Sequence, residues 1–203
     1  MWRRQGLLAL VVASMLTGTA WADSADSYRR SYLLEARGDY EGALALMSSI
    51  RKAEGASYFV TVRTGWLAYL AGDLARAEAQ YREAMTAKPG ATEAKLGLSA
   101  VLYAAHKWKD LEAVCKQILA DDAKHAIVRE RLAAGYYAMG NYPDAAAIYR
   151  KLADEYPGNL NLQTGYAWAL QRMGKREEAR RIFAGVLAVS PENINAIQGM
   201  AAK

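Results

Sequence analysis

Side chains that often perform catalysis or bind metals are scarce in this chain of 203 residues, which has one cysteine and two histidines. His106 and His125 are expected in turns at opposite ends of one helix, and a helix of about 13 residues separates them by roughly 20 Å. Cys115 is expected on a buried helix face, where a thiol packs as a small apolar group. Asp121 and Asp122 are interpreted as a solvated helix end. We therefore predict no catalytic residue, no metal site and no cofactor.

The first 22 residues have the pattern of a secretory signal peptide. A basic start with Arg3 and Arg4 precedes an apolar run over residues 6–16 and the small-residue box Ala20-Trp21-Ala22. We predict cleavage near Ala22, although an uncleaved signal could still tether the chain. The apolar run is too short for an ordinary transmembrane helix. The expected location of the mature chain is the bacterial periplasm or the outside of the cell.

The formal net charge is +5, and it falls to +3 without the two arginines of the signal peptide. A balance this mild gives no support for binding to nucleic acid. With 53% hydrophobic and 23% charged residues, the composition is that of a globular protein.

Turn-forming and small residues recur every 34 residues along the mature chain. One set of slots holds glycine, except for a histidine in the third repeat: Gly38, Gly72, His106, Gly140 and Gly174. Glycine makes up about 7% of typical sequences, so four glycines in five slots have a chance probability on the order of 10⁻⁴. A residue in this slot is expected to take a left-handed backbone conformation, which His106 adopts at some cost. A fixed period of this length predicts a repeat architecture.

Each repeat is predicted to form two helices. In residues 126–159, Leu132 and Tyr136 recur at helical spacing before Gly140, and Ala145 and Tyr149 recur after it. Asn159 and the equivalent Asn193 are expected to cap the next helices. A single helix pair cannot bury its apolar faces, so neighbouring pairs must stack into an α-solenoid.

This pattern resembles the tetratricopeptide repeat family over essentially the whole mature chain. The resemblance implies an all-α, right-handed α-solenoid of five helix-turn-helix repeats and a C-terminal helix. Small residues at the helix crossings, such as Ala145, and aromatic residues beside them, such as Tyr149, carry this resemblance. The solenoid would occupy residues 23–203, with repeats at 24–57, 58–91, 92–125, 126–159 and 160–193 and a capping helix at 194–203. In that last helix we expect a stripe of Ile194, Ile197 and Met200 or Ala201 to cover the final pair.

The same resemblance implies where partners bind, because the first helix of each pair lines the concave face in this family. Tyr69, Tyr103 and Tyr137 lie one repeat apart from each other on that face, and Trp66 and Trp168 flank them. Aromatic and arginine side chains are frequent hot spots of protein interfaces. The predicted partner-binding residues are Tyr28, Tyr32, Phe59, Val62, Arg63, Trp66, Tyr69, Leu96, Tyr103, Arg131, Tyr137, Trp168 and Arg172.

The favoured function is a non-enzymatic adaptor that binds a peptide or helix of a partner protein, in bacterial envelope assembly. A self-assembling scaffold that stacks through the solenoid ends, forming a weak homo-oligomer, is the main alternative. An enzyme subunit is disfavoured by the lack of a catalytic constellation. Glycan binding to the tyrosine and tryptophan side chains is a further alternative, because aromatic faces also stack on sugars.

Overall fold

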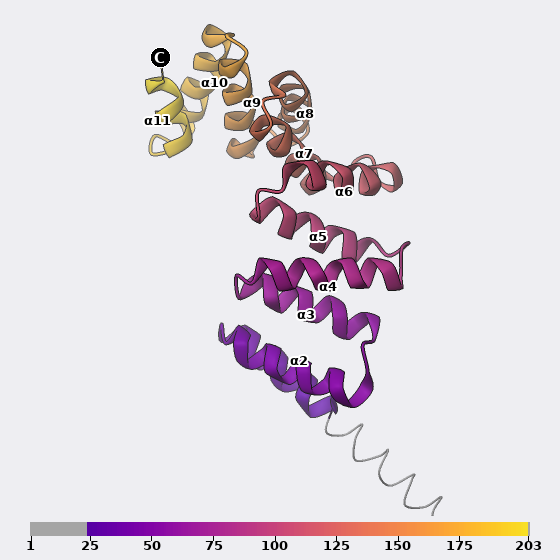
Figure 1. Ribbon diagram of the computed structural model, residues 1–203. Helices are drawn as coiled ribbons and strands as arrows, with labels where there is room; N and C mark the ends of the chain where they lie inside the picture. The colour runs from indigo at the N-terminus through magenta and orange to yellow at the C-terminus, as the bar shows by residue number, and fades with distance from the viewer. Residues whose placement is uncertain (1–23, 203) are drawn as a thin grey trace, which may run out of the picture. The chain divides into compact units, whose positions relative to one another are not determined.

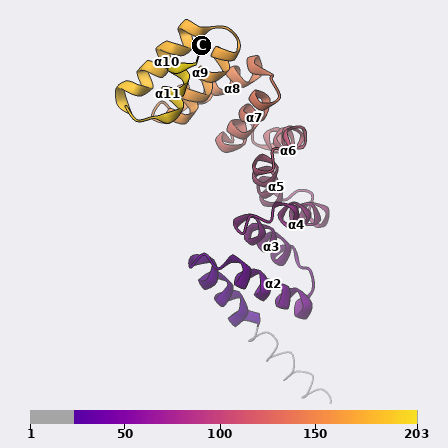
Figure 2. The ribbon, with the colours of Figure 1, turned by 60° about the vertical axis from the view of Figure 1, so that its left-hand side comes forward.

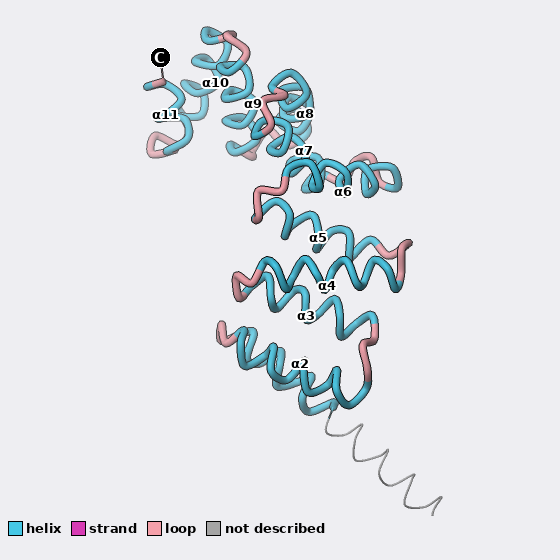
Figure 3. The backbone as a smooth tube through the Cα atoms, viewed as in Figure 1, coloured by secondary structure: helices cyan, strands magenta, loops and turns pink. Residues whose placement is uncertain are grey.

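The computed structural model describes residues 24–202, and this part of the chain is helical throughout, with short turns and no strand (Figures 1 and 3). The predicted all-α fold is confirmed. The predicted signal peptide at residues 1–22 lies outside the described residues. The first described helix covers residues 24–36. The helices that follow are α2 (Tyr40–Glu54), α3 (Tyr58–Leu70), α4 (Leu74–Ala87), α5 (Thr92–Ala104), α6 (Trp108–Asp121), α7 (Ala126–Ala138), α8 (Tyr142–Glu155), α9 (Leu160–Arg172), α10 (Arg176–Val189) and α11 (Ile194–Ala201).

Polar side chains set where several helices begin. The Asp39 and Asp73 carboxylates accept hydrogen bonds from backbone N–H groups in the first turns of α2 and α4. Asn159 and Asn193 do the same for α9 and α11, which confirms both predicted N-caps. Each cap satisfies one of the N–H groups that a helix start leaves without a partner.

The turns within the helix pairs require a left-handed backbone. Gly38, Gly72, Gly140 and Gly174 have φ angles between 78° and 82°, and His106 has a φ of 56° in the equivalent turn. Among the described residues, His106 is the one non-glycine residue with positive φ. The prediction that the histidine adopts the backbone conformation of the glycines it replaces is therefore confirmed.

The chain forms two compact units, Met1–Val101 and Leu102–Lys203, of which residues 24–101 and 102–202 are described. In the N-terminal unit, α3 packs against both α2 and α4. In the C-terminal unit, α6 to α11 pack in chain order, each helix on the next (Figure 2). Helix α5 begins in the N-terminal unit and ends in the C-terminal unit.

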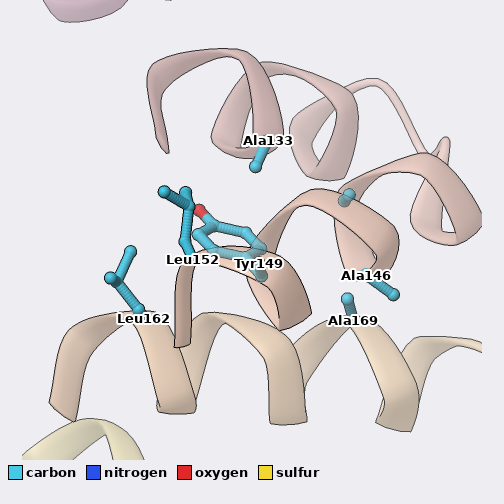
Figure 4. Packing of buried hydrophobic residues seen from close by; sticks show 7 residues of the cluster. Ala133, Ala146, Tyr149, Leu152, Leu162 and Ala169 are labelled. Atoms are coloured by element: carbon cyan, nitrogen blue, oxygen red, sulfur yellow. The ribbon is translucent and has the colours of Figure 1, made fainter. Parts of the chain in front are cut away.

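Small residues at the helix crossings allow close packing, as predicted. Ala133 and Ala145 are fully buried in one cluster of the C-terminal unit, and Ala167 is fully buried in the next. Figure 4 shows Ala133 of the first cluster with Tyr149 and Leu152. Ala43, Ala77 and Ala179 are equally buried at the positions equivalent to Ala145. A larger side chain at any of these crossings would push two helices apart.

The expectation for the C-terminal helix is wrong for its two isoleucines but right for Met200, which packs against the cluster around Phe183. Ile194 and Ile197 are 68% and 47% exposed, whereas Ala196 and Gly199 face the last pair and are buried. The reason is the space required by Phe183: a Cβ atom added to Gly199 would lie 2.3 Å from its ring. Only the small-residue face of α11 can approach that ring.

Candidate functional site

The N-terminal unit presents several of the predicted binding residues on two helices. Tyr28 and Tyr32 lie one turn apart on the helix at residues 24–36, and α3 carries Phe59, Trp66 and Tyr69. We call these five residues the aromatic strip. Tyr32, Phe59 and Trp66 are 49%, 50% and 41% exposed, although they are large aromatic side chains. Exposed aromatic surface of this kind typically marks an interaction site.

The carboxylate of Glu35 accepts hydrogen bonds from Trp66 of the strip and from the neighbouring Arg63. Its Oε1 accepts a hydrogen bond of 2.7 Å from the indole Nε1 of Trp66, and its Oε2 accepts one of 2.9 Å from Arg63. The Arg63 guanidinium also donates to the hydroxyl of Ser31 and lies 3.5 Å from the centre of the Tyr32 ring. This network fixes the orientation of the indole and of the Tyr32 ring before any partner binds.

Arg63 is therefore placed differently from the other predicted binding residues. It is only 6% exposed, and its charge is balanced by Glu35. A buried arginine with a carboxylate partner supports the surface rather than offering a cation to a ligand. Val62 and Leu96, also predicted, are half-buried.

Ring contacts further hold the strip. Tyr28 meets Phe59 edge to face at 5.6 Å between ring centres, and Trp66 lies 5.9 Å from Tyr69. The Tyr28 hydroxyl donates to Glu54, and burial, followed by the Glu54 charge, raises the pKa of this tyrosine to about 12. Tyr28 thus offers an apolar ring face with a hydroxyl group that stays protonated at physiological pH.

In the C-terminal unit the predicted residues form a less continuous set. Tyr103 is 42% exposed and meets Trp108 edge to face, and Tyr137 meets Tyr142 in the same way. Arg172 is exposed and donates to the Tyr142 hydroxyl at 2.8 and 3.1 Å. Arg131 is half-buried near Cys115.

Trp168, by contrast, forms the wall of a pocket of about 370 Å³ in the C-terminal unit. Asn161, Thr164, Gly165 and Trp168 reach the pocket from one face of α9, at the spacing i, i+3, i+4 and i+7. Tyr137 and Tyr149 line it from α7 and α8, and Asn195 and Gln198 line it from α11. We call this the amide pocket.

Sequence analysis did not select most of the residues of the amide pocket. Asn195 and Gln198 occupy the positions of Asn161 and Thr164 one repeat later, so the period itself carried the signal. They were missed because the selection favoured aromatic and charged side chains. Tyr149 was assigned to the core, where it does lie, with 9% of its surface exposed.

At one repeat position, the absence of a side chain leaves room for an aromatic ring of the preceding repeat. Added Cβ atoms at Gly97, Gly165 and Gly199 would lie 2.2, 2.8 and 2.3 Å from the rings of Tyr81, Tyr149 and Phe183, respectively. The equivalent positions in two other repeats are Arg63 and Arg131, and there the preceding helix carries Met47 and Cys115 instead of an aromatic residue. Glycine therefore accompanies a large ring, and arginine accompanies a smaller side chain.

The described residues give no indication of metal or thiol chemistry. Between residues 24 and 202, no three histidine, cysteine or acidic residues are grouped so that they could hold a metal ion. Cys115 is fully buried, and burial raises the pKa of its thiol to about 11, against a smaller opposing effect of Arg131.

In the described part of the chain, no helix has both the length and the apolar character needed to cross a membrane.

The consecutive helix pairs, their glycine turns and their small-residue crossings define a helical-repeat protein. Residues 19–189 match the sequence model of the tetratricopeptide repeat, and the chain belongs to that family. Tetratricopeptide-repeat proteins are generally non-enzymatic modules for protein–protein interaction.

Solved structures with the same fold are similar at low identity. A fragment of MamA from Desulfovibrio magneticus RS-1 has a TM-score of 0.78 at 17% identity, covering 85% of this chain and 97% of that one. A tetratricopeptide repeat protein from Parabacteroides merdae ATCC 43184 has a TM-score of 0.80 at 17% identity, with 89% and 72% covered. YrrB, described as having an unusual peptide-binding site, has a TM-score of 0.75 at 14% identity, with 87% and 91% covered. No curated protein matches the chain in sequence.

Proposed function

We propose that this protein is an adaptor that binds a peptide or helical segment of a partner protein on the aromatic strip. The observation that carries the proposal is the exposure of Tyr32, Phe59 and Trp66 on one surface, where Glu35 orients the Trp66 indole. Preorganised side chains lose little conformational entropy when a partner binds. Tryptophan and tyrosine are enriched among the few residues that supply most of the binding energy at interfaces.

The chemistry of the strip selects for an apolar segment. Its ring faces are uncharged, and its buried cation, Arg63, is already paired with Glu35. A free terminal carboxylate would find no unpaired cation in this network. Leucine, methionine or aromatic side chains of the partner would instead lie on the rings of Phe59 and Trp66.

A function in the bacterial envelope is part of this proposal and is supported by the signal-peptide pattern of residues 1–22. The test is fractionation of cells that express the full chain, with the mass of the recovered protein measured. A periplasmic or secreted protein that begins near Asp23 is the expected result. Recovery of the uncleaved chain in the cytoplasm would contradict an envelope role.

Affinity capture tests the adaptor function directly. Residues 23–203 are immobilised, native envelope extract is passed over them, and a Phe59→Ala/Trp66→Ala variant is run in parallel. Because both side chains are exposed, the variant should keep its helical circular dichroism. A protein retained by the wild type and lost from the folded variant is expected. Equal retention by both would place binding elsewhere.

Self-assembly is the second candidate, and one observation favours it. Val189, Ile194 and Ile197 are 70%, 68% and 47% exposed where α10 is followed by α11. Exposed aliphatic side chains on one segment can support association between copies. Light scattering at several concentrations separates the two functions, because a strict monomer would contradict the scaffold.

A further inference from the structure

The amide pocket combines aromatic and amide groups without a charged side chain. Its lining residues include no Asp, Glu, Lys or Arg. Among residues 24–202, the side-chain amides of Asn161, Asn195 and Gln198 have no hydrogen-bond partner. Each amide offers a donor and an acceptor side by side. The pocket is therefore equipped for a neutral ligand with several hydroxyl groups.

We propose that the amide pocket binds one ring of a neutral saccharide. The pocket is distinct from the aromatic strip, and this proposal does not depend on the proposed adaptor function. Its volume of about 370 Å³ lies near the lower end of the range for small-molecule sites, about 300–1,000 Å³.

Trp168 supplies the surface on which the sugar ring lies. The indole is half-buried and is held by Phe183, which it meets edge to face at 5.4 Å between ring centres. The negative face of an aromatic ring attracts the weakly positive C–H groups on one side of a pyranose. An indole fixed by a core residue offers this face with little loss of side-chain entropy.

Gly165 and Tyr149 make the floor of the pocket. Because Gly165 has no side chain, the Tyr149 ring reaches the space that a Cβ atom would fill, 2.8 Å from Cε1. Burial, with smaller contributions from Tyr103, Glu130 and Tyr137, raises the pKa of Tyr149, so its hydroxyl remains protonated. The floor is then an apolar ring that carries one hydroxyl donor.

Asn161, Asn195 and Gln198 stand at the rim from two helices, α9 and α11. Adjacent sugar hydroxyl groups can each donate to and accept from a planar amide, and this pairing needs no net charge. An extended peptide advances about 3.3 Å per residue with a polar backbone throughout, so most of a bound peptide would lie outside a pocket of this size.

The neighbouring surface offers a contrast that the test can use. A second pocket, of about 330 Å³, shares Trp168 but is lined by Arg172 and Arg176. Acidic sugars should prefer that pocket, because its arginines supply positive charge. The amide pocket should prefer uncharged sugars.

The test follows the tryptophan indole N–H signals of residues 23–203 by NMR. This segment contains Trp66, Trp108 and Trp168, so each signal can be assigned by substitution with phenylalanine. The probes are neutral trisaccharides of glucose, galactose, mannose and N-acetylglucosamine. At least one should shift the Trp168 signal with a Kd below about 10 mM while leaving Trp66 unshifted.

Variants separate recognition from folding. Asn195→Ala/Gln198→Ala removes two exposed amides and should weaken saccharide binding at least tenfold while the helical circular dichroism is unchanged, since about 1.4 kcal/mol corresponds to tenfold. Gln117→Ala, an exposed glutamine on α6, is the matched control and should bind like the wild type.

Three results would overturn the proposal. The first is that none of the trisaccharides shifts Trp168. The second is that only a glucuronic acid oligomer binds, and that Arg176→Ala abolishes this binding. The third is that a blocked neutral hexapeptide shifts Trp168 where the trisaccharides do not, which would make the pocket a peptide site.

Discussion

The aromatic strip of the N-terminal unit and the amide pocket of the C-terminal unit are built on the same repeat positions but differ in how their polar groups are satisfied. In the strip, the Trp66 indole and the Arg63 guanidinium both donate to Glu35. In the pocket, the amides of Asn195 and Gln198 have no partner among the described residues. The polar groups around the strip are thus already paired within the protein, whereas the pocket amides are available to a ligand.

The residue at the shared position explains part of this difference. Arg63 occupies the repeat position of Gly165 and joins the Glu35 network, whereas Gly165 leaves the Tyr149 ring open as a floor. A helical repeat can therefore change the chemistry of its surface by pairing two positions, one on each side of the contact between successive repeats. The crossings made by Ala77 and Ala145 stay the same in both units.

Removal of the carboxylate of Glu35 should have the largest effect on stability. Glu35→Ala leaves the Arg63 charge buried without its partner, and we expect a loss of about 3 kcal/mol in the free energy of unfolding. Chemical denaturation followed by circular dichroism measures it. Tyr142→Phe, which removes the acceptor of the exposed Arg172, should cost less than about 0.5 kcal/mol. Equal losses would contradict the contrast between the two regions.

The shared crossings should respond alike in the two units. Ala77→Leu and Ala145→Leu each overpack a fully buried crossing and should cost about 1–3 kcal/mol. Ala147→Leu, on the exposed face of α8, is the control and should leave the melting temperature nearly unchanged. An unchanged melting temperature in Ala145→Leu would show that the proposed register is wrong.

The glycine floor of the amide pocket should give a smaller change, with a sign that depends on position. Gly165→Ala forces the Tyr149 ring to move and should destabilise the chain by about 1 kcal/mol, despite the better helix propensity of alanine. Gly185→Ala, on α10, meets nothing within 4 Å and should stabilise it by about 0.5–1 kcal/mol. Thermal denaturation of the two variants measures both changes in stability. Two changes of the same sign would show that the Tyr149 ring does not lie against Gly165 as the pocket floor.

The turn at His106 should give the smallest effect. His106→Gly relieves a left-handed histidine with a φ of 56°, but it adds chain entropy to the unfolded state and loses a ring contact with Trp108. The net gain should be about 0.5 kcal/mol. Gly140→Ala in the equivalent turn, with a φ of 82°, should instead cost about 1 kcal/mol. The denaturation midpoint should rise in His106→Gly and fall in Gly140→Ala, and measuring both midpoints checks this difference.

Most of the fold could be predicted because its signals are local and periodic. A left-handed turn needs glycine or a tolerant residue such as His106, and a close crossing needs a small residue such as Ala145, so both features recur from one repeat to the next. The misassigned face of α11 shows the limit of this reasoning. Hydrophobicity pointed to Ile194 and Ile197, but the shape of the Phe183 ring selected Gly199.

The candidate sites were harder to predict because they depend on contacts between repeats. Nothing in the type of Arg63 indicates that it is buried; its burial follows from its ion pair with Glu35 of the preceding repeat. The pocket amides, Asn195 and Gln198, are ordinary solvent-exposed residues when taken one at a time. They become a site only where α11 packs beside α9.

The most direct test of the central claim compares the two regions with one ligand. Peptides are selected by display on residues 23–203, and the Kd of the best peptide is measured by calorimetry for the wild type, Trp66→Ala and Trp168→Ala. The account predicts that Trp66→Ala weakens binding by about 30-fold or more, as a central aromatic hot spot would, and that Trp168→Ala leaves it unchanged. An unchanged Kd in a folded Trp66→Ala, with binding lost in Trp168→Ala, would contradict it.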